Sequence, residues 1–145
     1  MTRRRNPFRI IAKLRSIDER IARTELATAH ESRRRAQERL DHFKQQYREQ
    51  TPIEERLTAG QLMSLRIRGI KSHEQLVEAA SEYERSAGEF DTRSDRWRSS
   101  AADLDAAERL ESRVKEEHAR QARHAAERAL DDLFSMLHDT KDTRP

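Results

Sequence analysis

A stripe of apolar and small residues recurs at alternating steps of four and three between residues 76 and 104. Its members are Leu76, Ala80, Tyr83, Ala87, Phe90, Ser94, Trp97, Ala101 and Leu104. Only Ser94 is polar, and the single tryptophan of the chain lies near the end of the series. A repeat of 3.5 residues keeps one narrow stripe on one side of a helix, so this helix needs a partner helix.

A second periodic stretch near the start of the chain predicts that partner. No Gly or Pro interrupts residues 8–51. The stripe begins with Ile10, Leu14, Ile17 and Ile21, and after a slip of one position it continues as Ala22, Leu26, Ala29, Arg33, Ala36, Leu40, Phe43 and Tyr47. We expect the slip to relax the left-handed supercoil at that point.

Breaks and caps divide the chain into a basic lead (1–7), helix one (8–51), a tip (52–72), helix two (73–138) and a disordered tail (139–145). Thr51-Pro52 ends helix one, because a residue before proline is disfavoured in a helix. Thr58 with Gln61, and Ser72 with Gln75, have the capping-box spacing, which predicts a short tip helix and then the start of helix two. Gly88, inside helix two, is expected to mark a close approach of the two backbones.

The predicted fold is a single all-α domain, a long antiparallel two-helix coiled-coil hairpin with a short helical tip and a C-terminal helix overhang. We expect Tyr47 opposite Leu76 and Trp97 opposite Leu26, to within about four residues, because large side chains then mostly face small ones. The expected seam residues are Leu26, Leu40, Phe43, Tyr47, Leu76, Tyr83, Phe90, Trp97 and Leu104. Helix one then begins opposite about residue 116, and the rest of helix two has no partner within the chain.

Composition and charge agree with this fold. Charged residues make up 39% of the chain and hydrophobic residues 34%, which is typical of long helices when the apolar positions are periodic. Basic residues predominate in the first 50 residues and acidic residues after residue 81, which favours pairing of the two helices within one chain. We therefore expect a monomer. No apolar run reaches the length of a membrane span, and we expect a cytosolic protein without an integral membrane segment.

The sequence shows no recognisable catalytic or metal site, and we expect neither enzymatic activity nor a cofactor. No two of the six histidines have the i, i+4 spacing of a helical metal site, and the chain has no cysteine. The basic cluster Arg33-Arg34-Arg35 lies between Glu31 and Glu38, which argues against nucleic-acid binding. Binding of the basic lead to a membrane surface remains a weaker alternative.

Two apolar patches exceed what a two-helix hairpin can bury, and we predict that both bind partners. One lies in the tip, at Leu62, Leu65, Ile67 and Ile70, and the other in the overhang, at Leu130, Leu133, Phe134 and Leu137. An amphipathic helix without an internal partner usually implies an external one. Local packing is the alternative for each patch.

Several short motifs follow one another along nearly the whole chain. They are Leu57-Thr58-Ala59-Gly60-Gln61-Leu62, then Asp95-Arg96-Trp97-Arg98, then Glu108-Arg109-Leu110-Glu111-Ser112-Arg113, and then Leu130-Asp131-Asp132-Leu133. With the hairpin pattern, they resemble the flagellar FliJ family. The tip segment Arg66-Ile67-Arg68-Gly69 lacks the aromatic residue expected in that family.

The resemblance implies a component of the bacterial flagellar type III protein export apparatus, similar to the stalk of a rotary ATPase and to a counterpart in virulence secretion. The implied partners are the hexameric export ATPase, the membrane-embedded export gate and the export chaperones. The implied location is the cytoplasmic face of the inner membrane. Which patch binds which partner stays open, and the alternative function is a generic coiled-coil scaffold or dimerisation protein.

Overall fold

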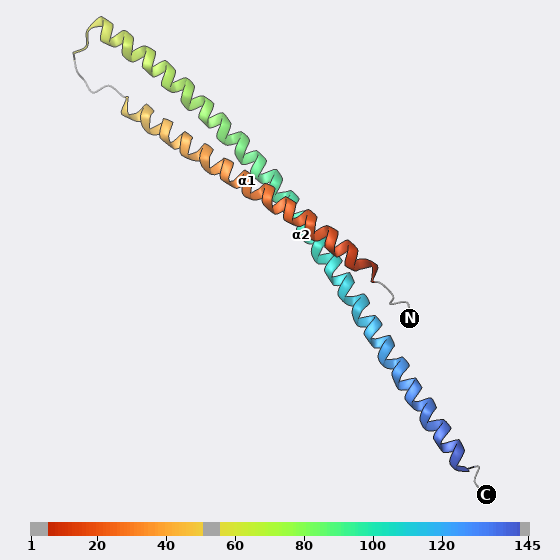
Figure 1. Cartoon of the computed structure of the whole chain (residues 1–145). Coiled ribbons are helices and arrows are strands. Elements are labelled where there is room, and N and C mark those ends of the chain that lie inside the picture. Colours follow the sequence, from red (N-terminus) through yellow and green to blue (C-terminus); the bar gives the residue numbers. More distant parts are fainter. Residues whose placement is uncertain (1–5, 51–55, 143–145) are drawn as a thin grey trace. The chain divides into compact units, whose positions relative to one another are not determined.

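The computed structural model describes residues 6–50 and 56–142, with the side chains of residues 139–142 left out. It contains two helices, α1 (Pro7–Glu49) and α2 (Ala59–Asp142), which are shown in Figure 1. The chain divides into two units, Glu19–Ser100 and Met1–Asp18 with Ala101–Pro145. Within each unit α1 packs antiparallel against α2, which confirms the predicted all-α helical hairpin.

The start of α1 is capped as its sequence predicts. The side-chain Oδ1 of Asn6 accepts a hydrogen bond from the backbone N of Phe8 at 3.0 Å, and Pro7 occupies the first helical position. Proline suits this position because the first turn of a helix has backbone N–H groups without helical partners. The helix ends at Glu49, and the predicted break at Thr51-Pro52 lies outside the described residues.

The start of α2 is a reciprocal capping box. Oε1 of Gln61 accepts a hydrogen bond from the backbone N of Thr58 at 2.9 Å, and Oγ1 of Thr58 accepts one from the backbone N of Gln61 at 3.3 Å. From Ala59 the helix then continues without interruption to Asp142, beyond the predicted end.

The predicted second helix start at Ser72 is wrong. Ser72 is buried within α2, and its hydroxyl donates a hydrogen bond to Oε1 of Gln50 at 2.6 Å, so it joins the two helices instead of capping one. No proline lies between residues 59 and 72, and a single helical glycine costs only about 1 kcal/mol relative to alanine. The residues expected to form a separate tip helix therefore form the first turns of α2.

Small residues form the centre of the interface in the Glu19–Ser100 unit. They occupy every seventh position on both helices and are buried: Ala22, Ala29 and Ala36 on α1, and Ser72, Ala79 and Ser86 on α2. No large side chain is fully buried in the described part of the chain. Small side chains at the seam let two helix backbones approach closely. The interface between the helices is therefore narrow and contains no wide hydrophobic core.

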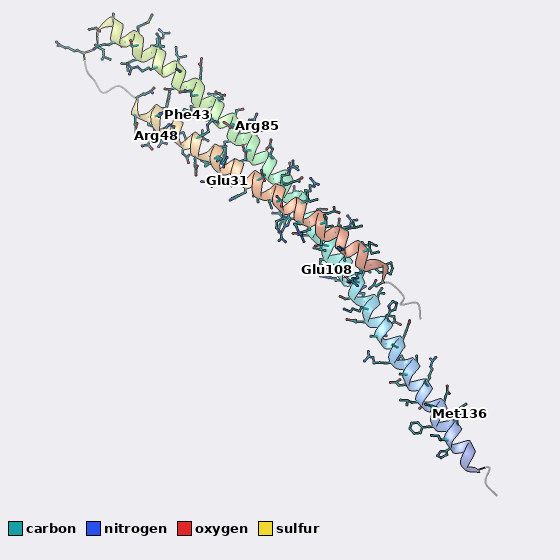
Figure 2. The ribbon with its side chains drawn as sticks, in the orientation of Figure 1. Glu31, Phe43, Arg48, Arg85, Glu108 and Met136 are labelled. Atoms are coloured by element: carbon teal, nitrogen blue, oxygen red, sulfur yellow. The ribbon has the colours of Figure 1, made fainter. Side chains whose placement is uncertain are left out.

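The predicted seam residues lie around this centre. Leu40 is buried, Tyr47 is 44% exposed, and the remainder have intermediate burial: Leu26, Phe43, Leu76, Tyr83, Phe90, Trp97 and Leu104. Figure 2 labels Phe43 on α1, among the side chains that lie between α1 and the adjoining part of α2. Most of the predicted seam residues are thus at least half-buried, and Tyr47 is exposed.

The predicted register is correct in places and shifted in others. The guanidinium of Arg33 lies 4.7 Å from the ring centroid of Phe90, and these two residues are opposite each other in the register that pairs Tyr47 with Leu76. The ring of Tyr47 faces His73 at 6.3 Å, three residues before Leu76 and within the expected range of about four residues. Trp97 forms a hydrogen bond with Glu19, which lies about two turns before Leu26, its expected partner.

The predicted slip in the seam of α1 is wrong. Ala12, Glu19 and Ala22 are buried, and they continue the heptad of the later seam without interruption. The apolar series thought to begin the seam is exposed to 63%, 57%, 45% and 48%, at Ile10, Leu14, Ile17 and Ile21 respectively. A slip of one residue would rotate the face that contacts α2 by about 100° around the axis of α1. An unbroken register keeps this face directed at α2 along the helix.

Gly88 marks no close approach of the two backbones. It lies on the exposed side of α2, and a Cβ atom built at this position would meet no atom within 4 Å. The expectation of a tight backbone contact there is therefore wrong.

In the Met1–Asp18 and Ala101–Pro145 unit, the pairing ends where α1 begins. Nδ2 of Asn6 donates a hydrogen bond to the carbonyl oxygen of Glu111 at 3.1 Å, and Arg15 lies 3.7 Å from the Asp103 carboxylate. From Ala119 to His138 every residue is exposed. Side chains around Met136 project outward from α2 in Figure 2, and this segment confirms the predicted C-terminal overhang.

Candidate functional site

The apolar patch near the start of α2 is divided between two faces of the helix. Leu62, Ile67 and Ile70 are more than half exposed, whereas Leu65 is half-buried. Leu65 lies beside Leu57 in a shallow hollow and continues the seam of α2. Three of the four predicted residues therefore form an outward surface, and the fourth faces the seam side.

The apolar patch near the end of α2 is one continuous face. Leu130, Leu133, Phe134 and Leu137 are spaced i, i+3, i+4 and i+7, which places them together on one side of a helix. All four are more than half exposed, with Phe134 at 66%. We call this face the C-terminal patch, and its four members are the predicted ones.

A third exposed apolar surface lies on α1, where the sequence had indicated an intrachain seam. Ile10, Leu14, Ile17 and Ile21 follow one side of the helix, and Ile11 widens that side. Ala12 and Glu19 lie on the side of α1 that is buried, away from this series. We call Ile10, Leu14, Ile17 and Ile21 the outer stripe. Extending the heptad of residues 22–43 backwards would have revealed it, since that register leads to residues 19 and 12.

A buried polar centre joins the helices in the Glu19–Ser100 unit. Oε1 of Glu19 accepts hydrogen bonds from Nε1 of Trp97 at 2.8 Å and from Nη2 of Arg23 at 2.7 Å. The Trp97 hydrogen bond is the main cause that lowers the pKa of Glu19; burial acts in the opposite direction, and Arg23 lowers the pKa further. Sequence reasoning missed this centre because Glu19 resembles the many solvated glutamates of a charged helix.

Almost two turns further along α1 from Glu19, a single carboxylate binds two arginines of α2. Oε2 of Glu25 accepts hydrogen bonds from Arg93 at 2.7 Å and from Arg96 at 2.6 Å. Arg39 and Glu82 form another pair between the helices, with 2.8 Å between the nitrogen and oxygen atoms. These ion pairs are partly exposed to solvent, so they help to define the register of the helices more than they stabilise them.

The basic cluster of α1 is neutralised by its neighbours. The carboxylate of Glu31 accepts hydrogen bonds from Arg34 at 2.8 and 3.0 Å and from Arg35 at 3.0 Å, and Arg34 also binds Glu38. These arginines lower the pKa of Glu31 to about 2, with Arg34 as the main cause. The guanidinium of Arg33 lies over Phe90. The three arginines are therefore engaged within the chain.

The histidines lie on the helix surfaces and beside aromatic rings. The ring of His30 is 5.8 Å from that of Phe90, and Nδ1 of His124 is 3.3 Å from a carboxylate oxygen of Glu127. Among residues 6–50 and 56–138, no group of three or more His, Asp or Glu side chains is placed to hold a metal ion. The helices of the described residues also contain no stretch long and apolar enough to cross a membrane.

The candidate binding surfaces in the described part of the chain are apolar helix faces, which are suited to binding other helices or hydrophobic grooves. They comprise the exposed start of α2, the C-terminal patch and the outer stripe. Comparisons with protein-family models, with curated proteins and with solved structures found no match to this chain.

Proposed function

We propose that this chain is a non-enzymatic, stalk-like component of a bacterial type III protein export apparatus of the flagellar kind. In this role it would bind a hexameric export ATPase, the export gate in the membrane and the export chaperones, at the cytoplasmic face of the inner membrane. The proposal rests on the resemblance of its motifs to the FliJ family and on the distribution of its exposed apolar surfaces.

The observation that carries the proposal is the exposed end of α2. From Ala119 to His138 every residue of the helix is exposed, and this segment carries an apolar face at Leu130, Leu133 and Phe134. A single helix with such a face is suited to insertion into the central opening of a protein ring, where apolar side chains can become buried. The paired part of the chain would hold this helix in position.

The start of α2 supplies a second surface for the gate or the chaperones. Leu62, Ile67 and Ile70 are exposed on a helix whose first turn is held by the Thr58–Gln61 capping box. A preformed helix loses little conformational freedom on binding, which favours recognition by a hydrophobic groove.

The test is binding of the chain to a purified export ATPase hexamer. Truncation after His118 should abolish binding, and Phe134→Asp in the full chain should weaken it at least about tenfold, because a carboxylate would enter an apolar contact. Ser135→Asp is the matched control, since the neighbouring residue is exposed outside the C-terminal patch. Unchanged binding by the truncated chain would reject the insertion of α2 into the ring.

A coiled-coil scaffold or dimerisation protein is the second candidate function. The outer stripe of α1 favours it, because this surface lies outside the interface that the chain uses for its own pairing. Binding to the ATPase hexamer separates the candidates, since a general scaffold has no reason to recognise it.

A further inference from the structure

We propose that two copies of this chain associate in parallel and in register through the outer stripe of α1. The surface comprises Ile10, Leu14, Ile17 and Ile21, and the occupant is the same surface of a second copy. The inference does not depend on the export role, and it differs from the single-copy state expected for a hairpin that pairs with itself.

The spacing of the stripe is that of a coiled-coil seam. The steps of four, three and four place Leu14 and Ile21 at a positions and Ile10 and Ile17 at d positions of a heptad. Because α1 uses its other side to pack against α2, this second seam is available to another helix. It belongs to one continuous helix, so its geometry follows from α1 alone.

The charges beside the stripe select the occupant and its direction. Lys13 is at a g position and Asp18 at the following e position, which are the positions that meet between two parallel helices. A parallel pair therefore brings Lys13 of each copy to Asp18 of the other. In an antiparallel pair g positions face g positions, so Lys13 would meet Arg20, and the two like charges would repel.

The structure leaves this charge pair accessible. The Asp18 side chain is 57% exposed, and within the described part of the chain its ion pair is a long 3.8 Å contact with Arg15. Arg20 and Glu25 repeat the g-to-e pattern, but Glu25 already binds Arg93 and Arg96, so its contribution should be smaller. The pair of Lys13 with Asp18 thus gives the main electrostatic preference.

The stripe is short, and the strength of association should reflect this. It spans about one and a half heptads, whereas independent coiled coils need about three or more. We therefore expect an equilibrium that shifts with protein concentration, not a permanent dimer. In compensation, packing against α2 already holds α1 helical, which lowers the entropic cost of association.

Sedimentation equilibrium of the full chain over a wide concentration range tests the association. The wild type should show a concentration-dependent increase in mass, and Ile17→Glu should raise the dissociation constant at least about tenfold, because it buries a carboxylate without a partner. Ser99→Glu, at an exposed position away from the stripe, should leave the equilibrium unchanged. A wild-type chain that stays monomeric at every concentration overturns the proposal.

Exchange of charges tests the direction. Lys13→Glu and Asp18→Lys should each weaken association about threefold or more, and the double variant should restore it, because the paired charges return with opposite signs. In an antiparallel pair, Lys13→Glu would instead strengthen association, since it would face Arg20. That result rejects the parallel arrangement.

The absence of cysteine from the sequence allows a direct measurement of register. Leu14→Cys should form an intermolecular disulfide readily, because equal a positions of two parallel helices lie within disulfide distance. Ser99→Cys serves as the control for random oxidation. Thermal unfolding of Ile17→Glu completes the test: the melting temperature at low concentration should be unchanged, and a clear decrease would place Ile17 inside the chain's own seam and overturn the proposal.

Discussion

Nε1 of Trp97 donates a hydrogen bond to Oε1 of Glu19 at 2.8 Å, and Glu19 is only 6% exposed. Arg23 binds the same oxygen atom at 2.7 Å. A buried carboxylate is tolerated only with such partners, because its transfer from water is otherwise strongly unfavourable. The pair therefore joins α1 to α2 with a directional contact in an interface otherwise made mainly of small side chains.

Replacing Trp97 should separate its packing from its hydrogen bond. Trp97→Ala should lower the free energy of unfolding by about 2 kcal/mol, less than for a fully buried tryptophan because Trp97 is only partly buried. Trp97→Phe keeps most of the ring contact but leaves Glu19 without its indole donor, so we expect a smaller decrease. Circular dichroism during thermal unfolding measures both. Equal melting temperatures for Trp97→Phe and the wild type would show that the hydrogen bond contributes little.

The Glu31 cluster should make stability depend on pH in a defined window. Arg34, and then Arg35, lower the pKa of Glu31 from 4.5 to about 2. Since the folded state binds the proton more weakly, this contribution is fully present above pH 4.5 and disappears as the pH falls towards 2. The Glu31→Gln variant should therefore differ from the wild type in melting temperature above pH 4.5 and converge with it near pH 2. Because the cluster is exposed, added salt should reduce the difference.

Gly88→Ala should stabilise the chain. Gly88 lies within α2, and an added Cβ would meet no atom within 4 Å. Alanine is favoured over glycine inside a helix by about 1 kcal/mol, partly because it restricts the unfolded chain. Chemical denaturation measures the change, with Gly69→Ala, which also meets no atom within 4 Å, as a second position. A lower midpoint for Gly88→Ala would instead indicate a close backbone contact.

Enlarging a buried alanine should separate the helices. Ala22 is 1% exposed at the centre of the seam, so Ala22→Leu should destabilise the chain by about 1–3 kcal/mol through overpacking. Ala27→Leu places the same side chain on the exposed side of α1 and should change stability by less than about 0.5 kcal/mol. If both variants unfold at the same temperature, the seam tolerates larger residues than its alanines suggest.

The seam of α2 could be predicted because its aromatic residues repeat every seven positions. Tyr83, Phe90 and Trp97 mark one face clearly, and the structure places them at the interface. The early part of α1 could not be predicted by the same reasoning, because its most hydrophobic residues are not its buried ones. Hydrophobicity favours Ile10 and Leu14, whereas the continuous register selects Ala12 and Glu19.

The two apolar patches of α2 illustrate a similar limit. Counting the apolar residues that a two-helix hairpin cannot bury indicated both patches, and every predicted member except Leu65 is more than half exposed. The Ser72 start was predicted wrongly because capping-box spacing alone does not reveal whether the hydroxyl caps its own helix. Here the Ser72 hydroxyl binds Gln50, a residue that sequence spacing does not connect with it.

The antiparallel pairing of the helices also has a consequence for the order in which their contacts form during folding. The Gln50–Ser72 hydrogen bond joins residues 22 positions apart, whereas the Asn6–Glu111 hydrogen bond joins residues 105 positions apart. Loop-closure entropy grows with the logarithm of loop length, so direct closure of the longer loop costs about 1.4 kcal/mol more. Pairing that begins near the connection between the helices avoids most of this cost, because each new contact then closes only a few more residues. We therefore expect the first turns of α1 to be the last to fold onto α2 and the first to open.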